Sequence, residues 1–154
     1  MEKSTWNSIE DRYRRWPQDR ASAVEASEFD RAMAGFELNI DPDYRRFVLL
    51  YGAGFVGPNP IYGLRKAEFM GTIGGKSMAP EITNWFREKQ WPGIDDWLIF
   101  SVDQGGNPVG FASDGTVWIS DQLDFRQIVQ IAKNFEDYLL KWCLRIKPVR
   151  QGDR

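Results

Sequence analysis

Histidine is absent from this chain of 154 residues, and cysteine occurs once, as Cys143. Without histidine the chain holds no Ser-His-Asp or Cys-His nucleophile pair and no zinc site with an imidazole ligand. A single cysteine excludes an internal disulfide bond and fits a reducing compartment. We therefore expect a cytoplasmic protein without a metal or cofactor.

Long apolar runs and a dominant charge are also missing. Phe47–Leu50 is among the longest apolar runs, far short of the roughly 20 residues that cross a membrane. Met1–Glu10 mixes charged and polar residues, whereas a secretory signal would have an apolar stretch there. The 20 Lys and Arg residues against 22 Asp and Glu give a net charge of −2. We therefore expect no membrane and no nucleic acid as direct partners.

Aromatic residues, by contrast, are plentiful. Hydrophobic residues make up 42% of the chain and aromatics 14%, with seven Trp and ten Phe. This composition is typical of a globular protein and excludes a disordered one. At this length a single core suffices, so residues 1–154 are predicted to form one domain.

Three helices are predicted in the first third of the chain. Trp6, Ile9, Tyr13 and Trp16 recur at helical spacing, which predicts a helix over 5–16. Ser27 is the expected N-cap of a second helix, which Gly35 weakens without ending. The clearest helix begins at the N-cap Asp41 and ends at Gly52, a residue that readily adopts the left-handed conformation.

A break into extended structure follows. Residues 55–62 contain two short β-prone segments around a Gly-Pro-Asn-Pro turn, which predicts a hairpin. The glycines of 52–57 follow a helix and lack a Gly-Lys-Ser/Thr sequence, so they do not indicate a phosphate-binding loop. Residues 66–80 are expected to form a loop, and Thr83 to cap a short helix that runs to about Gln90.

The strongest β signal comes next. Three β-prone segments, 97–102, 108–112 and 116–120, are separated by turn-forming residues at 103–107 and 113–115. They predict a three-stranded antiparallel meander.

The last segment predicts a helix. Asn134 or Lys133 lies at its expected start, and Phe135, Leu139, Trp142 and Cys143 suit one helix face. Residues 127–132 fit either an additional strand or the beginning of this helix.

Four segments of the chain, in sequence order, resemble the SUKH superfamily, which includes yeast cell-wall-synthesis regulators and bacterial immunity proteins. They are "IDPDYRRFVLLYGAG", "IYGL", "DQGGNPVGFASDGTVW" and "NFEDYLLKW". The resemblance covers about residues 27–143 and leaves outside it an extra N-terminal helix within 1–16 and a basic tail at 147–154. One departure is that Pro42 precedes Tyr44 by two residues, whereas the family usually has three.

The resemblance implies an α+β fold, in which an antiparallel meander packs against N-terminal and C-terminal helices, and a binding role without a catalytic centre. Many bacterial members look like immunity proteins that neutralise a toxin domain encoded beside them. The alternative is an intracellular scaffold or regulatory interaction domain that has no toxin. We expect a monomer or a weak homodimer.

Two groups of acidic residues are the candidate partner-binding sites. The direction of the predicted strands sets one group at each end of the sheet, where either could attract a basic toxin such as a nuclease. Asp also favours turns, so each residue has a purely structural alternative. Trp85 and Trp91 lie near predicted breaks, either as exposed anchors or in the core. The two groups are Asp95, Asp96 and Asp114 at one end, and Asp103, Asp121 and Asp124 at the other.

Overall fold

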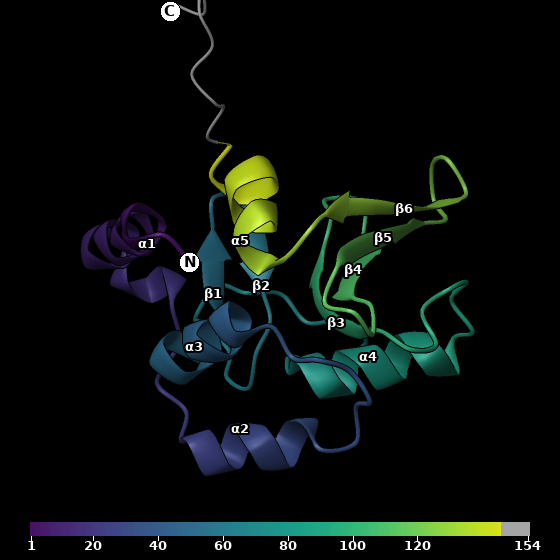
Figure 1. The fold of residues 1–154 in the computed structure, drawn as a ribbon, viewed down its shortest axis with the longest axis horizontal. Helices are drawn as coiled ribbons and strands as arrows, with labels where there is room; N and C mark the ends of the chain where they lie inside the picture. The colour runs from purple at the N-terminus through teal and green to yellow at the C-terminus, as the bar shows by residue number, and fades with distance from the viewer. Residues whose placement is uncertain (146–154) are drawn as a thin grey trace, which may run out of the picture.

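The computed structural model describes residues 1–145 and contains helices and strands in an α+β arrangement (Figure 1). The predicted fold class is therefore confirmed. The helices are α1 (Lys3–Arg15), α2 (Ala26–Met33), α3 (Pro42–Tyr51), α4 (Ala79–Glu88) and α5 (Phe135–Tyr138), with a short 3₁₀ turn at Pro17–Asp19 and a π-helical turn at Leu139–Cys143. The strands are β1 (Gly54–Val56), β2 (Asn59–Ile61), β3 (Leu98–Val102), β4 (Pro108–Phe111), β5 (Val117–Asp121) and β6 (Gln127–Ala132).

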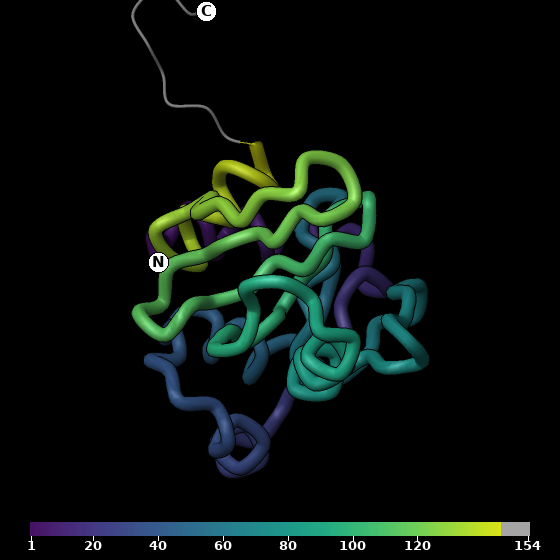
Figure 2. The backbone as a smooth tube through the Cα atoms, turned by 90° about the vertical axis from the view of Figure 1, so that its right-hand side faces the viewer, coloured from purple at the N-terminus to yellow at the C-terminus, as the bar shows by residue number. Residues whose placement is uncertain are grey.

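The main sheet is an antiparallel meander in the order β3-β4-β5-β6, and β1 and β2 form a separate hairpin. Figure 2 shows the strands of the meander running side by side. Residues 127–132, which the sequence left open, form the strand β6 and pair with β5 over its whole length. β6 is the last strand in the order, so within residues 1–145 one of its edges has no strand beside it.

The two faces of the meander have different coverings. Strand pairing aligns Val109 with Ile119 and Ile119 with Val129, and side chains aligned in this way lie on one face. This face packs against α3 and the C-terminal helix. The other face packs on α4 and the loop that follows it, where Ser120 Oγ donates a hydrogen bond of 2.6 Å to the carbonyl of Pro92.

Aromatic rings join the helices to the sheet. Tyr44 of α3 is fully buried, with its ring centre 5.2 Å from that of Phe111 and 5.5 Å from that of Phe135. Phe100 stacks on Phe111 at 4.3 Å. The hydroxyl of Tyr44 donates to the carbonyl of Tyr62 at 2.7 Å, so the one polar atom of this buried side chain has a partner.

The predicted ends of α3 are confirmed. Asp41 Oδ1 accepts a hydrogen bond from the backbone N–H of Asp43 at 2.8 Å, and Gly52 ends the helix with φ at 77°. Asp41 also has a second role, because its Oδ2 accepts from the N–H of Phe135 at 2.9 Å. One buried carboxylate therefore holds the beginnings of both α3 and α5.

The predicted bounds of α2 are wrong. Its N-cap position is Glu25, and Ser27 lies within the first turn. The helix ends at Met33, before Gly35, because the following residues turn away from the helix axis.

The sequence predicted that Thr83 caps α4, but Thr83 lies in the middle of this helix. The helix begins at Ala79, and its second residue is Pro80, which is favoured in the first turn. The buried hydroxyl of Thr83 accepts from the N–H of Ile99 at 2.8 Å and donates to the carbonyl of Ala79 at 2.8 Å. A residue type that commonly caps helices here joins a helix to a strand.

The C-terminal helix differs from the prediction at Trp142. Asn134 is its N-cap, as expected, and accepts from the N–H of Asp137 at 2.8 Å. The last turn is π-helical, with a hydrogen bond of 2.7 Å from the N–H of Leu144 to the carbonyl of Leu139. The wider turn leaves Trp142 exposed, while Cys143 stays buried. The predicted basic tail at 147–154 lies outside the described residues.

Candidate binding groove

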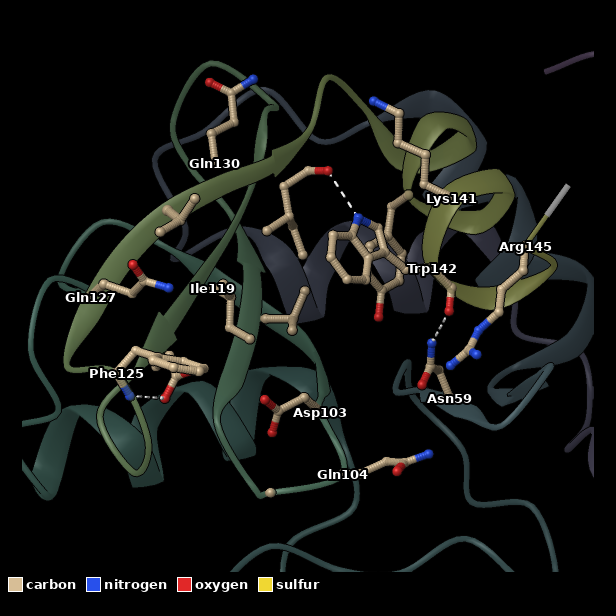
Figure 3. A pocket seen from close by; sticks show the side chains of 16 residues that line it. Asn59, Asp103, Gln104, Ile119, Phe125, Gln127, Gln130, Lys141, Trp142 and Arg145 are labelled. Atoms are coloured by element: carbon tan, nitrogen blue, oxygen red, sulfur yellow. Dashed lines mark hydrogen bonds between the residues drawn. The ribbon is translucent and has the colours of Figure 1, made fainter. Parts of the chain in front are cut away.

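A groove of about 760 Å³ lies between the sheet and the C-terminal helix (Figure 3). One wall is the part of the β4–β6 face that the C-terminal helix leaves uncovered. The other wall is the C-terminal helix itself, with the β3–β4 turn and the β5–β6 loop at one end. Strands and a helix thus form most of the groove, so its shape is fixed by the same contacts that hold the core.

The floor of the groove is apolar. Val109, Ile119 and Val129 lie next to one another across three strands, and Ile131 and Tyr138 continue this surface towards the helix. Val109 and Tyr138 are buried, whereas Val129 is exposed. Apolar area that is already held in place favours binding, because little conformational entropy is lost when a partner covers it.

Trp142 is the aromatic residue on the helix side. Its indole N–H donates to the carbonyl of Ile131 at 2.9 Å, as the dashed line in Figure 3 shows. Ile131 is the extra residue of a β-bulge, since Val117 pairs with Ala132 while Trp118 pairs with Gln130. The bulge therefore orients Trp142, whose side chain remains 46% exposed.

Asn59 of β2 holds the same turn from the opposite side. Its side-chain amide donates to the carbonyl of Trp142 at 2.7 Å. Both the backbone and the ring of Trp142 are thus held by hydrogen bonds.

Phe125 extends from the β5–β6 loop at the other side and is 73% exposed. The loop is itself ordered by hydrogen bonds: Asn107 Oδ1 accepts from the N–H groups of Gln122 and Leu123 at 3.1 and 3.3 Å. Asp121 Oδ1 accepts from the N–H groups of Asp124 and Phe125 at 3.0 and 3.4 Å. The exposed ring is therefore carried by a fixed loop.

Asp103 and Asp121 line this end of the groove, and Asp124 lies next to them in the β5–β6 loop, at the end of the sheet where the strand directions put all three. A Cβ atom added to Gly105 would lie 3.4 Å from Asp103 Oδ1 and 3.9 Å from Asp124 Oδ2, so these two groups face the same point. Asp121 is tied to the backbone N–H of Asp124. Among the ion pairs found within residues 1–145, none includes any of the three.

Cations lie on the helix side. Lys141 Nζ is 3.0 Å from Asp137 Oδ2 in an i,i+4 ion pair, and Arg145 lies near Asn59 at the rim in Figure 3. Burial opposes ionisation of Asp137, but hydrogen bonds from Lys133 N–H and Lys141 lower its pKa overall. The groove is therefore acidic at the loop end and basic along the helix.

The second acidic group lies at the opposite end of the sheet. Asp95, Asp96 and Asp114 are all exposed, in the segment before β3 and the β4–β5 turn. Asp114 Oδ1 accepts hydrogen bonds from the N–H and the hydroxyl of Thr116, which lower the pKa of Asp114. It thus has the structural role of a turn residue.

The two candidate tryptophans lie away from the groove and are half-buried. Trp91 donates from its indole N–H to the carbonyl of Ser120 at 3.0 Å and packs edge-on against Phe86. Trp85 also packs edge-on against Phe86, with Lys89 Nζ 5.5 Å from the centre of its ring. Their contacts fasten α4 and the following loop to the fold.

Sequence reasoning missed the aromatic side of the groove. Phe125 had a usable signal, since an aromatic residue stood in a charged segment between two predicted elements, "DFR". For Trp142 the helical periodicity gave the opposite answer, because the π-helical turn cannot be read from spacing.

Within residues 1–145, no group of three or more Cys, Asp and Glu side chains is arranged to hold a metal ion. Among the same residues, no helix combines the length and apolar character that a membrane crossing requires. Burial raises the pKa of the Cys143 thiol to about 12, so it is not a thiolate nucleophile at neutral pH.

The fold and the groove define a class: an α+β domain with a partly apolar groove between its sheet and its C-terminal helix. The SMI1 / KNR4 family (SUKH-1) matches residues 23–141, and the chain belongs to this family. The resemblance expected over 27–143 is thereby confirmed. The comparison with curated proteins gave no match.

Proposed function

We propose that this chain is a non-catalytic immunity protein, which binds a bacterial toxin domain in the cytoplasm and blocks its action. Family membership supports a binding domain of the SUKH type. The observation that carries the proposal is the groove: an aromatic side chain held at both its ring and its backbone lies at one end, and carboxylates that have no cationic partner among residues 1–145 lie at the other.

Inhibition by binding requires high affinity, and toxin–inhibitor pairs are among the tightest non-covalent complexes known. Such affinity comes from a few central aromatic or charged anchors in a surface that reorganises little. Trp142 has this character because its indole hydrogen bond fixes the ring while nearly half of the side chain stays exposed.

The acidic end of the groove favours a basic target such as a nuclease. A nuclease presents Lys and Arg side chains to phosphate groups, and carboxylates at fixed positions can take the place of those phosphates. Opposite charges also accelerate association, which matters for a protein that must intercept a toxin before it acts.

Co-expression tests this proposal. A candidate toxin domain is expressed with and without the chain, and surviving cells are counted; calorimetry then measures complex formation between the purified proteins. We expect rescue of growth and a one-to-one complex. If there is no rescue and no complex, immunity against this toxin is refuted and the scaffold alternative is favoured.

A further inference from the structure

The two ends of the groove differ in chemistry, and this difference restricts what can lie in it. At the loop end, Asp103 and Asp124 face the same point beside Gly105, and no cation among residues 1–145 pairs with them. In the middle the floor is apolar, and at the helix end Trp142 presents a fixed ring near Arg145 and near Lys141, whose charge is paired with Asp137. A complementary occupant therefore has a cation at one point and an apolar side chain further along.

A second copy of this chain fits less well. A free edge strand invites pairing with another copy, and β6 has no charged residue or proline within Gln127–Ala132. An antiparallel pair of β6 strands in full register would, however, set Arg126 of each copy opposite Lys133 of the other. Like charges directly opposite one another destabilise strand pairing.

We propose that the groove is the toxin-binding surface and that it accepts an extended segment of the toxin. In this arrangement a Lys or Arg side chain lies between Asp103 and Asp124, and an apolar side chain packs on Trp142. The inference rests on the proposed function and specifies its surface, its polarity and the chemistry of the segment bound. The acidic group at Asp95, Asp96 and Asp114 takes no part.

Gly105 allows a direct test of the acidic end. Its φ lies outside the left-handed region, and an added Cβ would have only ordinary contacts, so Gly105→Ala should fold normally. Gly105→Lys places an ammonium group beside the two carboxylates and occupies the position of the proposed cation. We expect it to weaken toxin binding by at least about 100-fold, whereas Gly105→Ala changes binding little.

Trp142→Ala tests the aromatic end, and Trp16→Ala is its matched control. Both side chains are 46% exposed, but Trp16 lies at the end of α1, outside the groove. Truncation of a hot-spot aromatic residue should weaken binding about 30-fold for Trp142 and leave it unchanged for Trp16. Circular dichroism and urea unfolding confirm that each variant is folded.

Asp124→Asn and Asp95→Asn compare the two acidic groups by loss of one charge each. Loss of the groove charge should slow association about tenfold at low salt and reduce its dependence on salt. Loss of the charge at Asp95 should change neither.

The experiment measures binding of the purified toxin domain to the wild type and these variants by surface plasmon resonance. Binding that is lost in the groove variants and kept in the controls supports the proposal. A toxin that binds the groove variants as tightly as the wild type overturns the groove proposal and leaves the immunity function intact.

A second arm needs no toxin. A phage library of short random peptides is selected on the full chain, and enriched peptides are retested on the variants. We expect peptides with Lys or Arg and an apolar residue, which bind neither Gly105→Lys nor Trp142→Ala but still bind Trp16→Ala. If no peptides are enriched, or if the enriched peptides bind the variants as well as the wild type, the groove proposal is overturned. This result holds whether or not the wild type binds the toxin. A stable wild-type dimer that Trp142→Ala dissociates would likewise refute it.

Discussion

Asp41→Ala should destabilise the protein more than the loss of an ordinary helix cap. Asp41 is buried, with one oxygen accepting from Asp43 N–H and the other from Phe135 N–H. Loss of an N-cap costs about 0.5–2 kcal/mol. Loss of the second hydrogen bond leaves the buried N–H of Phe135 without a partner, which costs about 1–3 kcal/mol more. We expect the free energy of unfolding to fall by about 2–4 kcal/mol, and the melting temperature by roughly 5–15 °C.

Asn134→Ala is the matched comparison, because Asn134 caps α5 through a single bond at an exposed site. It should cost about 1 kcal/mol. Urea unfolding followed by tryptophan fluorescence measures both variants on one scale. If Asp41→Ala costs no more than Asn134→Ala, then the bond to Phe135 contributes nothing to stability and the reasoning is wrong.

Three further predictions concern the core and the turns. Thr83→Val keeps the shape of the side chain but leaves the N–H of Ile99 unpaired, so the free energy of unfolding in urea should fall by about 1–3 kcal/mol. Gly57→Ala should lower the melting temperature, because φ is 59° and the added Cβ would overlap the carbonyl of Cys143, whereas Gly71→Ala meets no atom within 4 Å and should not. The raised pKa of Cys143, about 12 in the folded state against 9.0 for a free thiol, means that folding favours the neutral thiol. The thiol should therefore contribute its full stabilisation below pH 9 and lose it as the pH rises above 9. Urea unfolding across this range should show a steeper fall in the free energy of unfolding for the wild type than for Cys143→Ala.

The elements that could be predicted are those specified by neighbouring residues. Both ends of α3 follow from one capping carboxylate and one glycine, and the turns of the meander from short polar segments. The acidic end of the groove was also predictable, since alternating strand directions bring Asp103, Asp121 and Asp124 to one end of the sheet.

The elements that could not be predicted depend on distant contacts. Residues 127–132 have no decisive periodicity, and pairing with β5 makes them a strand. Thr83 resembles a cap until Ile99 is beside it. The aromatic side of the groove depends on the π-helical turn, which rotates Trp142 away from the face that regular helical spacing gives it.

Two irregularities meet at Trp142, and both bear on where the functional surface lies. The bulge adds one residue to β6, and the π-helical turn widens the end of the C-terminal helix. Each gives up regular hydrogen bonding, and such irregularities are often found at functional sites. Here the bulged carbonyl of Ile131 receives the indole N–H, and the widened turn presents the ring to the groove. The backbone itself thus favours the groove over the second acidic group as the binding surface.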